Sequence, residues 1–254
     1  MAALEAEGIE VVYLNPERPP IGTYGIPLRS IPYTRETIMV RGGAIIERPV
    51  PAYKKGLEVY HAKRLMELGC PILHTIHGKG AYEASNMVWI DDTSVMLGLG
   101  LRGNREGLSQ VEQILRGQGV EDIHITHLPG YLYTRKHQVG GASGIFHLDM
   151  TFGMAYYKVA VLWPGGVGYE TVRWLENKGI DIIEVSDEEL HVCAPNLLPI
   201  APKKVIVSAL HLNMTKELKK RGIDVIELDL TECAKGGGGP TCSSWAFHTV
   251  SGFF

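Results

Sequence analysis

Hydrophobic and polar residues follow one another along this chain in an order that recurs five times. An amphipathic helical stretch leads to a glycine, and a short apolar run rich in Val and Ile comes next. The glycines of the five modules are Gly8, Gly69, Gly119, Gly179 and Gly222. Glycine just past a helix is typical of a left-handed cap, and Val and Ile favour strands. The pattern therefore predicts an array of similar units at intervals of roughly 40 to 60 residues.

Pairs of extended stretches fill the gaps between these modules. They cover residues 37–46, 87–97, 154–163 and 197–207, and their turns are Gly-Gly, Asp-Asp, Lys158 and Pro-Lys. Short apolar runs broken in this way are typical of hairpins. The repeated unit is then hairpin, helix and strand, or ββαβ. A doubly wound parallel sheet fits less well because it needs crossovers without hairpins.

About five ββαβ units predict a closed α/β propeller with five-fold pseudo-symmetry, formed by residues 1–254 as a single domain. In the first module the expected strand is residues 9–14, after a helix that opens the chain. A closed ring would need one more strand before that helix, to pair with a last strand near residues 244–248. We therefore expect either a missing N-terminal strand or a smaller first unit.

Composition narrows the functional class. The chain has 254 residues, is 45% hydrophobic and carries a formal net charge of −3, which offers no footprint for nucleic acid. No apolar run is long enough to predict a membrane span, and the first residues lack the features of a secretory signal. Four cysteines without CxxC spacing are typical of free thiols in a cytoplasmic protein. The oligomeric state, including a homodimer, stays open.

Candidate chemistry gathers at the starts of the predicted units. Cys242 follows the glycine-rich stretch 235–241, whose four glycines let the backbone approach another group closely. His147 and Asp149 are two residues apart, so a strand would place both on one face. Glu36 and Glu83 each precede a hairpin. Taken singly, each has an ordinary structural explanation, such as a buried thiol, a polar strand contact or a surface ion pair.

Equivalent positions of a ring converge on one mouth of its axis. Several carboxylates, a histidine and a cysteine would then share one site. Packed carboxylates repel each other unless a cation joins them, and a planar guanidinium with forked N–H donors suits such a site.

With these motifs the chain resembles the pentein enzymes that modify guanidino groups, namely arginine deiminase, dimethylarginine dimethylaminohydrolase and the amidinotransferases. His147-Leu148-Asp149 resembles the histidine-x-acid motif of that superfamily, and GGGGPTC resembles its glycine-rich approach to the nucleophile. Residues 33–37 resemble a Thr-Arg-Asp-Thr motif with Glu36 in place of the aspartate. Residues 83–86 resemble an acid-Gly-Gly-Asp motif that ends here in Asn86.

The resemblance implies a role for each residue. Cys242 is expected as nucleophile, His147 as proton donor and Glu83 as the group that orients the histidine. Glu36 and Asp149 are expected to clamp the guanidinium, with Asn86 beside them. Arg102 falls where the superfamily holds the substrate carboxylate. Neither a cofactor nor a metal is expected, and the two departures, Glu36 and Asn86, leave the substrate open.

The implied activity is hydrolysis of a guanidino C–N bond in arginine or a methylated arginine through an S-amidino cysteine intermediate. Transfer of the amidino group to an amine is the alternative reaction, and a non-catalytic binding protein with the same ring is the alternative class. Two weaker motifs remain. Residues 98–103 match GxGxxG, a nucleotide-binding pattern, and the pairs His74/His77 and His124/His127 suggest a metal site.

Overall fold

Four ββαβ units form the body of the structure, which is a computed structural model that describes residues 1–14, 22, 25, 28, 33–129, 145–191 and 193–244. The units are β1 (Thr37–Val40), β2 (Gly43–Ile46), α2 (Leu57–Glu67) and β3 (Ile72–Thr75); β4 (Met87–Asp91), β5 (Ser94–Leu99), α3 (Arg105–Gly117) and β6 (Asp122–His127); β7 (Phe152–Tyr156), β8 (Val159–Leu162), α4 (Tyr169–Asn177) and β9 (Asp181–Glu184); and β10 (Leu198–Ala201), β11 (Lys204–Ser208), α6 (Leu212–Lys220) and β12 (Asp224–Leu228).

Each unit contains its own three-stranded sheet. The first two strands pair antiparallel as a hairpin, and the third pairs parallel with the second after the helical crossover. The four hairpins therefore lie where the hydrophobic pattern predicts them. The glycine after each helix has a positive φ, between +67° at Gly179 and +83° at Gly119, which confirms the left-handed caps.

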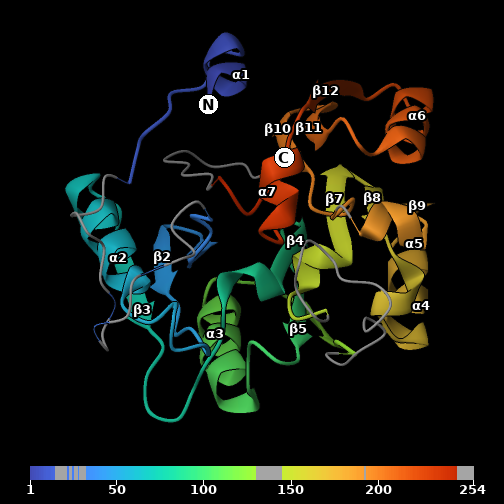
Figure 1. Cartoon of the computed structure of the whole chain (residues 1–254). Coiled ribbons are helices and arrows are strands. Elements are labelled where there is room, and N and C mark those ends of the chain that lie inside the picture. Colours follow the sequence, from blue (N-terminus) through green and yellow to red (C-terminus); the bar gives the residue numbers. More distant parts are fainter. Residues whose placement is uncertain are drawn as a thin grey trace.

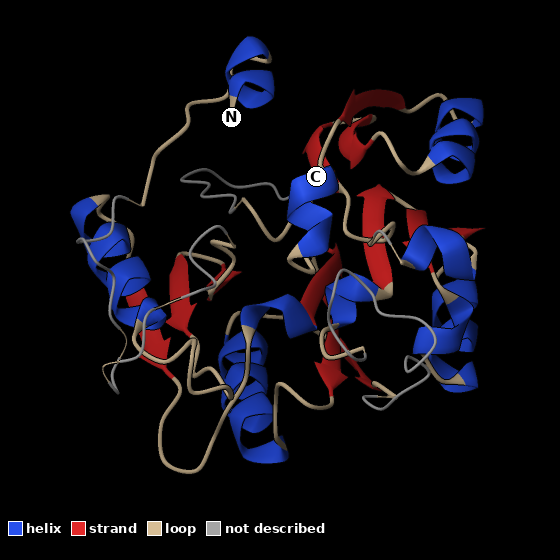
Figure 2. Ribbon diagram, viewed as in Figure 1, coloured by secondary structure: helices blue, strands red, loops and turns tan. Residues whose placement is uncertain are grey.

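The four sheets follow one another around a centre (Figure 1). They run from β1–β3 on the left, through the bottom and right of the view, to β10–β12 at the top, with the long helices on the outside. Figure 2 shows the same alternation of strands inside and helices outside. Shorter elements connect them: α1 (Ala2–Ala6), α5 (Asp187–Leu190), α7 (Thr231–Lys235) and the 3₁₀ turns η1 (Ala84–Asn86), η2 (Leu148–Met150) and η3 (Pro164–Gly166).

The first predicted module departs from the pattern. Helix α1 and the left-handed Gly8 (φ +75°) are present, but residues 9–14 form no strand. Val12 and Tyr13 are 42% and 52% exposed. The C-cap residue of α1, Glu7, contacts β11 through its side chain, which lies 2.8 Å from Lys204 Nζ. A lone extended segment needs a partner edge to become a strand, and no edge pairs with it in the part that the structure describes. A fifth unit is thus not seen there.

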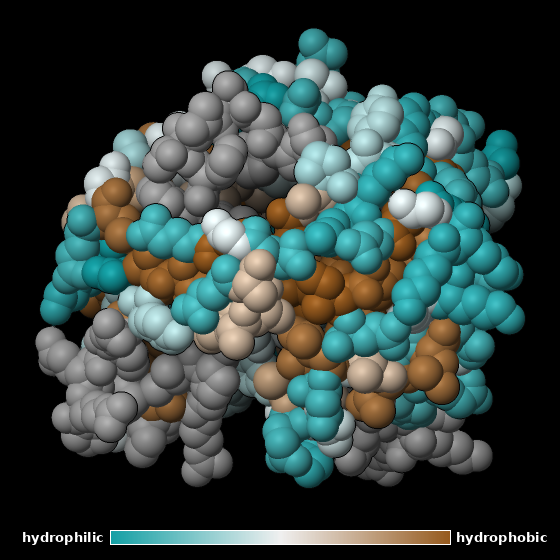
Figure 3. All heavy atoms as spheres, turned by 90° about the horizontal axis from the view of Figure 1, so that it is seen from above, coloured by the Kyte–Doolittle hydropathy of each residue, from teal (hydrophilic) through white to brown (hydrophobic). Residues whose placement is uncertain are grey.

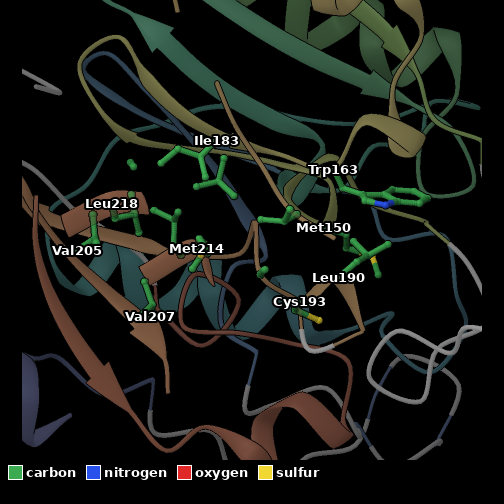
Figure 4. Close-up of a cluster of buried hydrophobic side chains, with 14 of the residues drawn as sticks. Met150, Trp163, Ile183, Leu190, Cys193, Val205, Val207, Met214 and Leu218 are labelled. Carbon is green, nitrogen blue, oxygen red and sulfur yellow. The ribbon is translucent and has the colours of Figure 1, made fainter. Parts of the chain in front are cut away.

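The apolar core lies between neighbouring units. One cluster joins the first two units, with Ile38 and Ile45 against Leu108 and Val111. A second cluster joins the middle units around Phe152. The third joins the last two, and Figure 4 shows it between Ile183, Trp163 and the helix residues Met214 and Leu218. Seen from above in Figure 3, hydrophilic side chains surround the hydrophobic ones. No helix in the described residues is long and apolar enough to span a membrane.

Candidate active site

The predicted site residues meet where the units begin. Glu36 directly precedes β1, Glu83 precedes η1 and β4, His147 precedes η2 and β7, and Asn196 lies just before β10. Turns η1 and η2 contact each other, and β1 contacts η1. Segments far apart in the sequence therefore come together, and side-chain contacts link the second unit start to the third (Glu83 to His147) and the third to the fourth (Asp149 to Asn196).

His147 and Glu83 form a buried pair. The Nε2 atom of His147 lies 2.9 Å from Oε2 of Glu83, and the two residues are 9% and 0% exposed. The backbone N–H of Val50 donates to the other oxygen, Oε1, at 2.9 Å. The Glu83 carboxylate is therefore fixed in place and holds one ring nitrogen of His147, which leaves Nδ1 as the atom for proton transfer.

The local backbone at His147 and Asp149 differs from the prediction. Both were expected on a strand, but residues 148–150 form the 3₁₀ turn η2, and His147 precedes it with extended dihedral angles. The turn aims the two side chains by its own geometry instead of by strand alternation. Asn86 holds this turn, because its Oδ1 accepts from the backbone N–H of Leu148 at 3.2 Å.

Cys242 lies against Asp149 and Asn196. Its Sγ is 3.8 Å from Oδ2 of Asp149 and 3.1 Å from Nδ2 of Asn196. The same Nδ2 contacts Asp149 Oδ2 at 3.1 Å, and Asn196 Oδ1 accepts from the Cys242 backbone N–H at 3.2 Å. Asn196 thus ties the thiol and the carboxylate together. Sequence reasoning missed Asn196, although it lies at the fourth unit start, where the repeat would have pointed to it.

The surroundings of Cys242 favour its neutral thiol form. Burial of the sulfur, followed by the nearby Asp149 charge, raises the pKa of Cys242 well above its usual range. Burial and Asp149 also raise the pKa of Cys193 to about 12. Asp149 is 4% exposed, and its Oδ1 is buried without a hydrogen-bond partner in the described residues. Such an oxygen is suited to accept an N–H from a bound ligand.

A buried lysine joins the acidic residues. The Nζ atom of Lys54 lies 2.7 Å from Glu36 Oε2, 2.8 Å from Glu83 Oε2 and 3.8 Å from Glu47 Oε1. All four residues are at most 7% exposed. Sequence reasoning missed Lys54 and Glu47, because neither occupies a unit start: Glu47 follows β2, and Lys54 lies in the loop that leads to α2.

The charged groups of this cluster shift one another's pKa values. Burial and the Glu36 charge raise the pKa of Glu47 well above its usual range, which favours the uncharged form of its carboxyl. Burial works against the Lys54 charge, but Glu36, Glu83 and Glu47 outweigh it and raise the pKa of Lys54. Burial likewise opposes the Glu83 charge, yet Lys54, His147 and Arg102 together lower the pKa of Glu83. The cluster is thus an ammonium held between two carboxylates.

Arg102 and Asn86 are engaged by the protein itself. The Arg102 guanidinium contacts Glu83 Oε1 at 3.5 Å and the Tyr53 hydroxyl at 3.1 Å, and it lies 4.8 Å from the centroid of the Phe146 ring. Asn86 is fully buried and donates from Nδ2 to the backbone carbonyl of Arg102 at 3.2 Å. Asn86 therefore links the turn that carries Arg102 to the one that carries Asp149.

The glycine-rich stretch packs against Tyr33. A Cβ on Gly236 would come within 1.8 Å of the Tyr33 hydroxyl, and one on Gly238 would come within 2.2 Å of the Tyr33 ring. A Cβ on Gly239 would come within 2.7 Å of Asn196 Oδ1. The Tyr33 hydroxyl donates to the Cys233 carbonyl at 2.9 Å. These glycines let the segment lie close to both side chains, and this close packing sets the position of Cys242.

The two weaker motifs have structural explanations. In the GxGxxG match, side chains of the protein itself occupy the space beside each glycine: Leu148 beside Gly98, Leu128 beside Gly100 and Tyr82 beside Gly103. His74 bonds Gln110 at 2.9 Å, and His124 bonds Thr171 at 2.9 Å and stacks on Trp174. Within the residues that the structure describes, no group of three or more metal-binding side chains could hold an ion.

Curated relatives resemble most of the chain. A 2-nitroimidazole nitrohydrolase of Mycobacterium sp. (strain JS330) is 28% identical over 246 residues, which cover 94% of this chain and 64% of that protein. The uncharacterized protein YkgA of Bacillus subtilis (strain 168) is 28% identical over 155 residues, which cover 61% of this chain and 48% of YkgA. The chain thus spans less than two thirds of the length of either relative.

Family and structural comparisons agree on the fold. The arginine deiminase family model matches residues 167–247. The N-terminal domain of ArgZ, a cyanobacterial arginine dihydrolase, superposes with a TM-score of 0.77 at 17% identity over 95% of this chain and 81% of that one. A dimethylarginine dimethylaminohydrolase gives 0.74 at 21% identity over 95% and 83%. In fold, the chain resembles these two pentein enzymes. Its mixed α/β units with small sheets match those of these structural neighbours. The stretch 167–247 that the family model matches contains Asn196 and Cys242.

Proposed function

We propose that this chain is a pentein hydrolase that breaks a C–N bond at a guanidino carbon through a covalent adduct on Cys242. Arginine and methylated arginines are the substrates that the resemblance to the guanidino-modifying enzymes implies. One observation carries the proposal: the Cys242 thiol lies 3.8 Å from Asp149, and Asp149 shares a turn with His147, which is held at 2.9 Å by Glu83. A nucleophile, a binding acid and an oriented proton carrier thus lie on adjoining segments.

The first step forms the adduct. A guanidino group that donates an N–H to Asp149 offsets the negative charge that disfavours the Cys242 thiolate, so binding promotes transfer of the thiol proton from Cys242 to His147. The thiolate attacks the central carbon, and a C–S bond forms. The C–N bond to the leaving amine then breaks as His147 gives that nitrogen a proton. This leaves an S-amidino cysteine and a neutral amine.

The second step releases the product. Water attacks the amidino carbon while His147 takes its proton, and the C–S bond breaks so that Cys242 leaves as thiolate. The product carries a new C–O bond in place of the C–N bond. Glu83 keeps the imidazole oriented in both steps because it is itself fixed by Val50 and Lys54. An amine in place of water would make the same site an amidinotransferase.

Replacement of Cys242 by serine tests the assignment. We expect the wild-type protein to convert at least one of arginine, dimethylarginine, agmatine and guanidinoacetate, and Cys242→Ser to lose turnover by about four orders of magnitude. Mass spectrometry of quenched wild-type reactions should find the amidino adduct on Cys242. Product analysis with and without glycine as acceptor separates hydrolysis from transfer. Full activity of Cys242→Ser would refute the proposal.

A second candidate reaction is denitration of a nitro-substituted azole, favoured by the nitrohydrolase relative that matches 94% of this chain. The carbon between the two nitrogens of a 2-nitroimidazole is also an amidine carbon. Attack by Cys242 would form a C–S bond and expel nitrite with the bonding electrons. Water would then displace the sulfur and give the imidazolone, with loss of one proton. Nitrite release from 2-nitroimidazole, absent in Cys242→Ser, is the measurement.

We also propose that residues 1–254 form one domain and that its ring has five units. The four described units, their order around a centre and the helix at residues 2–6 support it.

A further inference from the structure

Lys54 occupies the acidic cluster beside the proposed reaction centre. Lys54 is 7% exposed, and its ammonium makes two short contacts, at 2.7 Å with Glu36 and 2.8 Å with Glu83. The loop that supplies it is anchored by the backbone N–H of Lys54 on the Pro51 carbonyl at 3.1 Å and by Val50 on Glu83. Lys54 is thus a built-in cation, and a buried ion pair with two partners is not readily displaced.

The position of Lys54 changes what Glu36 can do. The sequence motifs assign Glu36 and Asp149 to a two-carboxylate clamp on the substrate cation. The structure pairs Glu36 with Lys54, whereas Asp149 keeps a buried oxygen without a partner in the described residues. A substrate at Cys242 therefore meets one free carboxylate. A second cation brought to Glu36 would also meet the Lys54 ammonium and be repelled.

We infer that Lys54 is a specificity-determining residue that withdraws Glu36 from substrate binding, so that the site takes a neutral amidine carbon at least as well as a cationic one. The substrate class is then a weakly basic amidine-type group, such as a nitroguanidine or a nitro-substituted azole, whose N–H or ring nitrogen faces Asp149. This inference rests on the proposed function, because it concerns the carbon that Cys242 attacks.

A matched pair of substrates tests the inference. L-arginine carries a cationic guanidino group, and Nω-nitro-L-arginine has the same tail with a neutral one; 2-nitroimidazole serves as a neutral probe without an amino-acid tail. We expect kcat/KM of the wild-type protein for the neutral member to equal or exceed that for the cationic one. Lys54→Met frees Glu36 and should shift the ratio toward the cation by at least about tenfold.

Three further variants make the test specific. Lys54→Arg keeps the positive charge and should preserve the wild-type preference. Lys55→Met removes a neighbouring charge of the same loop and should also leave the ratio unchanged. The double variant Lys54→Met with Glu36→Gln removes the ion pair as a unit, so it avoids an unpaired buried charge if the single variant does not fold. Its ratio should return to within about threefold of the wild-type value, because no charged Glu36 remains to bind a cation.

The possible outcomes distinguish failure of the role of Lys54 from failure of the proposed function. Turnover through Cys242 with an unchanged ratio in Lys54→Met would overturn the role of Lys54 and leave the proposed function intact. The role of Lys54 would also be overturned if the wild-type protein prefers arginine and this preference falls by about tenfold or more in the double variant. That result would show that Glu36 binds the substrate cation in the wild-type protein. Absence of turnover and of any Cys242 adduct with all three compounds, and with the guanidino compounds tested above, would overturn both.

Discussion

At the scale of single residues, the thiol of Cys242 is held in its neutral form. Burial and Asp149 raise its pKa well above the usual range. We therefore predict that alkylation of Cys242 in the free protein by the neutral reagent iodoacetamide accelerates about tenfold per pH unit between pH 6 and 9. Intact-mass spectrometry measures the alkylation rate. The Cys242→Ser variant shows how much of the signal comes from the other cysteines. A plateau near pH 7 would show a thiolate that the site already stabilises.

Glu47 provides a second test of local electrostatics. Its folded-state pKa is raised, first by burial and then by Glu36, above the unfolded value of about 4.3. Its stabilising contribution is complete below that unfolded pKa and is lost as pH rises through the folded-state pKa. Gln is uncharged at every pH and can still accept the hydrogen bond from the Ala84 backbone, 2.7 Å from Glu47 Oε2.

Glu47→Gln should therefore gain stability over the wild-type protein as pH rises from 4.5 to 8. The gain is up to about 1.4 kcal/mol per pH unit until the folded-state pKa is passed. Urea unfolding of both proteins across this pH range gives the difference between their free energies of unfolding. The contributions of Glu83 and Lys54 largely cancel in that difference. Glu47→Met lacks the acceptor for Ala84 and serves as a control that should be destabilised throughout. A difference that does not change with pH would contradict an uncharged Glu47.

The repeat predicts some of these residues and not others. Glu36, Glu83, His147 and Cys242 could be singled out because each occupies the start of a predicted unit. Asn196 occupies the equivalent place just before β10, so its repeat position could have pointed to it, but a neutral amide does not stand out as a catalytic residue type. Lys54 lies in an irregular loop, and its partnership with two acids depends on the path of that loop, which hydrophobic periodicity does not encode.

At the scale of elements, the turns at the unit starts hold one another. The side-chain oxygen of Asn86 accepts from the backbone of η2, and that of Asn196 accepts from the backbone of Cys242. Each turn is thus positioned by the one before it. Sequence patterns indicated an extended stretch through His147 and Asp149, because a 3₁₀ turn of three residues has no periodicity that separates it from a short strand.

Close packing around Asn196 makes Gly239 a sensitive position. An alanine Cβ there would lie 2.7 Å from Asn196 Oδ1 and 2.9 Å from its carbonyl, so Asn196 must move. Because Asn196 holds the backbone and the sulfur of Cys242, we predict that Gly239→Ala lowers kcat/KM by about 10²-fold.

The matched control is Gly117→Ala at the end of α3, where nothing lies within 4 Å of the added carbon. It should leave activity unchanged and stabilise the helix by at most about 1 kcal/mol. Steady-state kinetics and thermal unfolding of both variants measure the effects. Wild-type activity in Gly239→Ala would show that Asn196 does not position the nucleophile.

At the scale of the whole molecule, neighbouring units are joined twice. Their apolar clusters lie at the boundaries between units, and polar contacts join them further out. Arg41 of the first unit donates to the Gln118 carbonyl of the second at 3.1 Å. Lys178 of the third lies 2.7 Å from Asp122 of the second, and Arg221 of the fourth pairs with Asp181 of the third at 2.6 Å. The surface pairs add little energy individually, so the shared cores dominate the coupling.

Shared cores imply that the units unfold together, as a single domain would. Phe152 is fully buried in the cluster that joins the second and third units. We predict that Phe152→Ala lowers the free energy of unfolding by about 3 to 5 kcal/mol in one cooperative transition. Urea unfolding followed by far-UV circular dichroism and by tryptophan fluorescence should give coincident curves. Leu212→Ala, at the first residue of α6 where the side chain is 71% exposed, should change stability by only about 0.5 kcal/mol. Two separate transitions, with only one shifted by Phe152→Ala, would instead show units that fold independently, and the repeat would then be an open array.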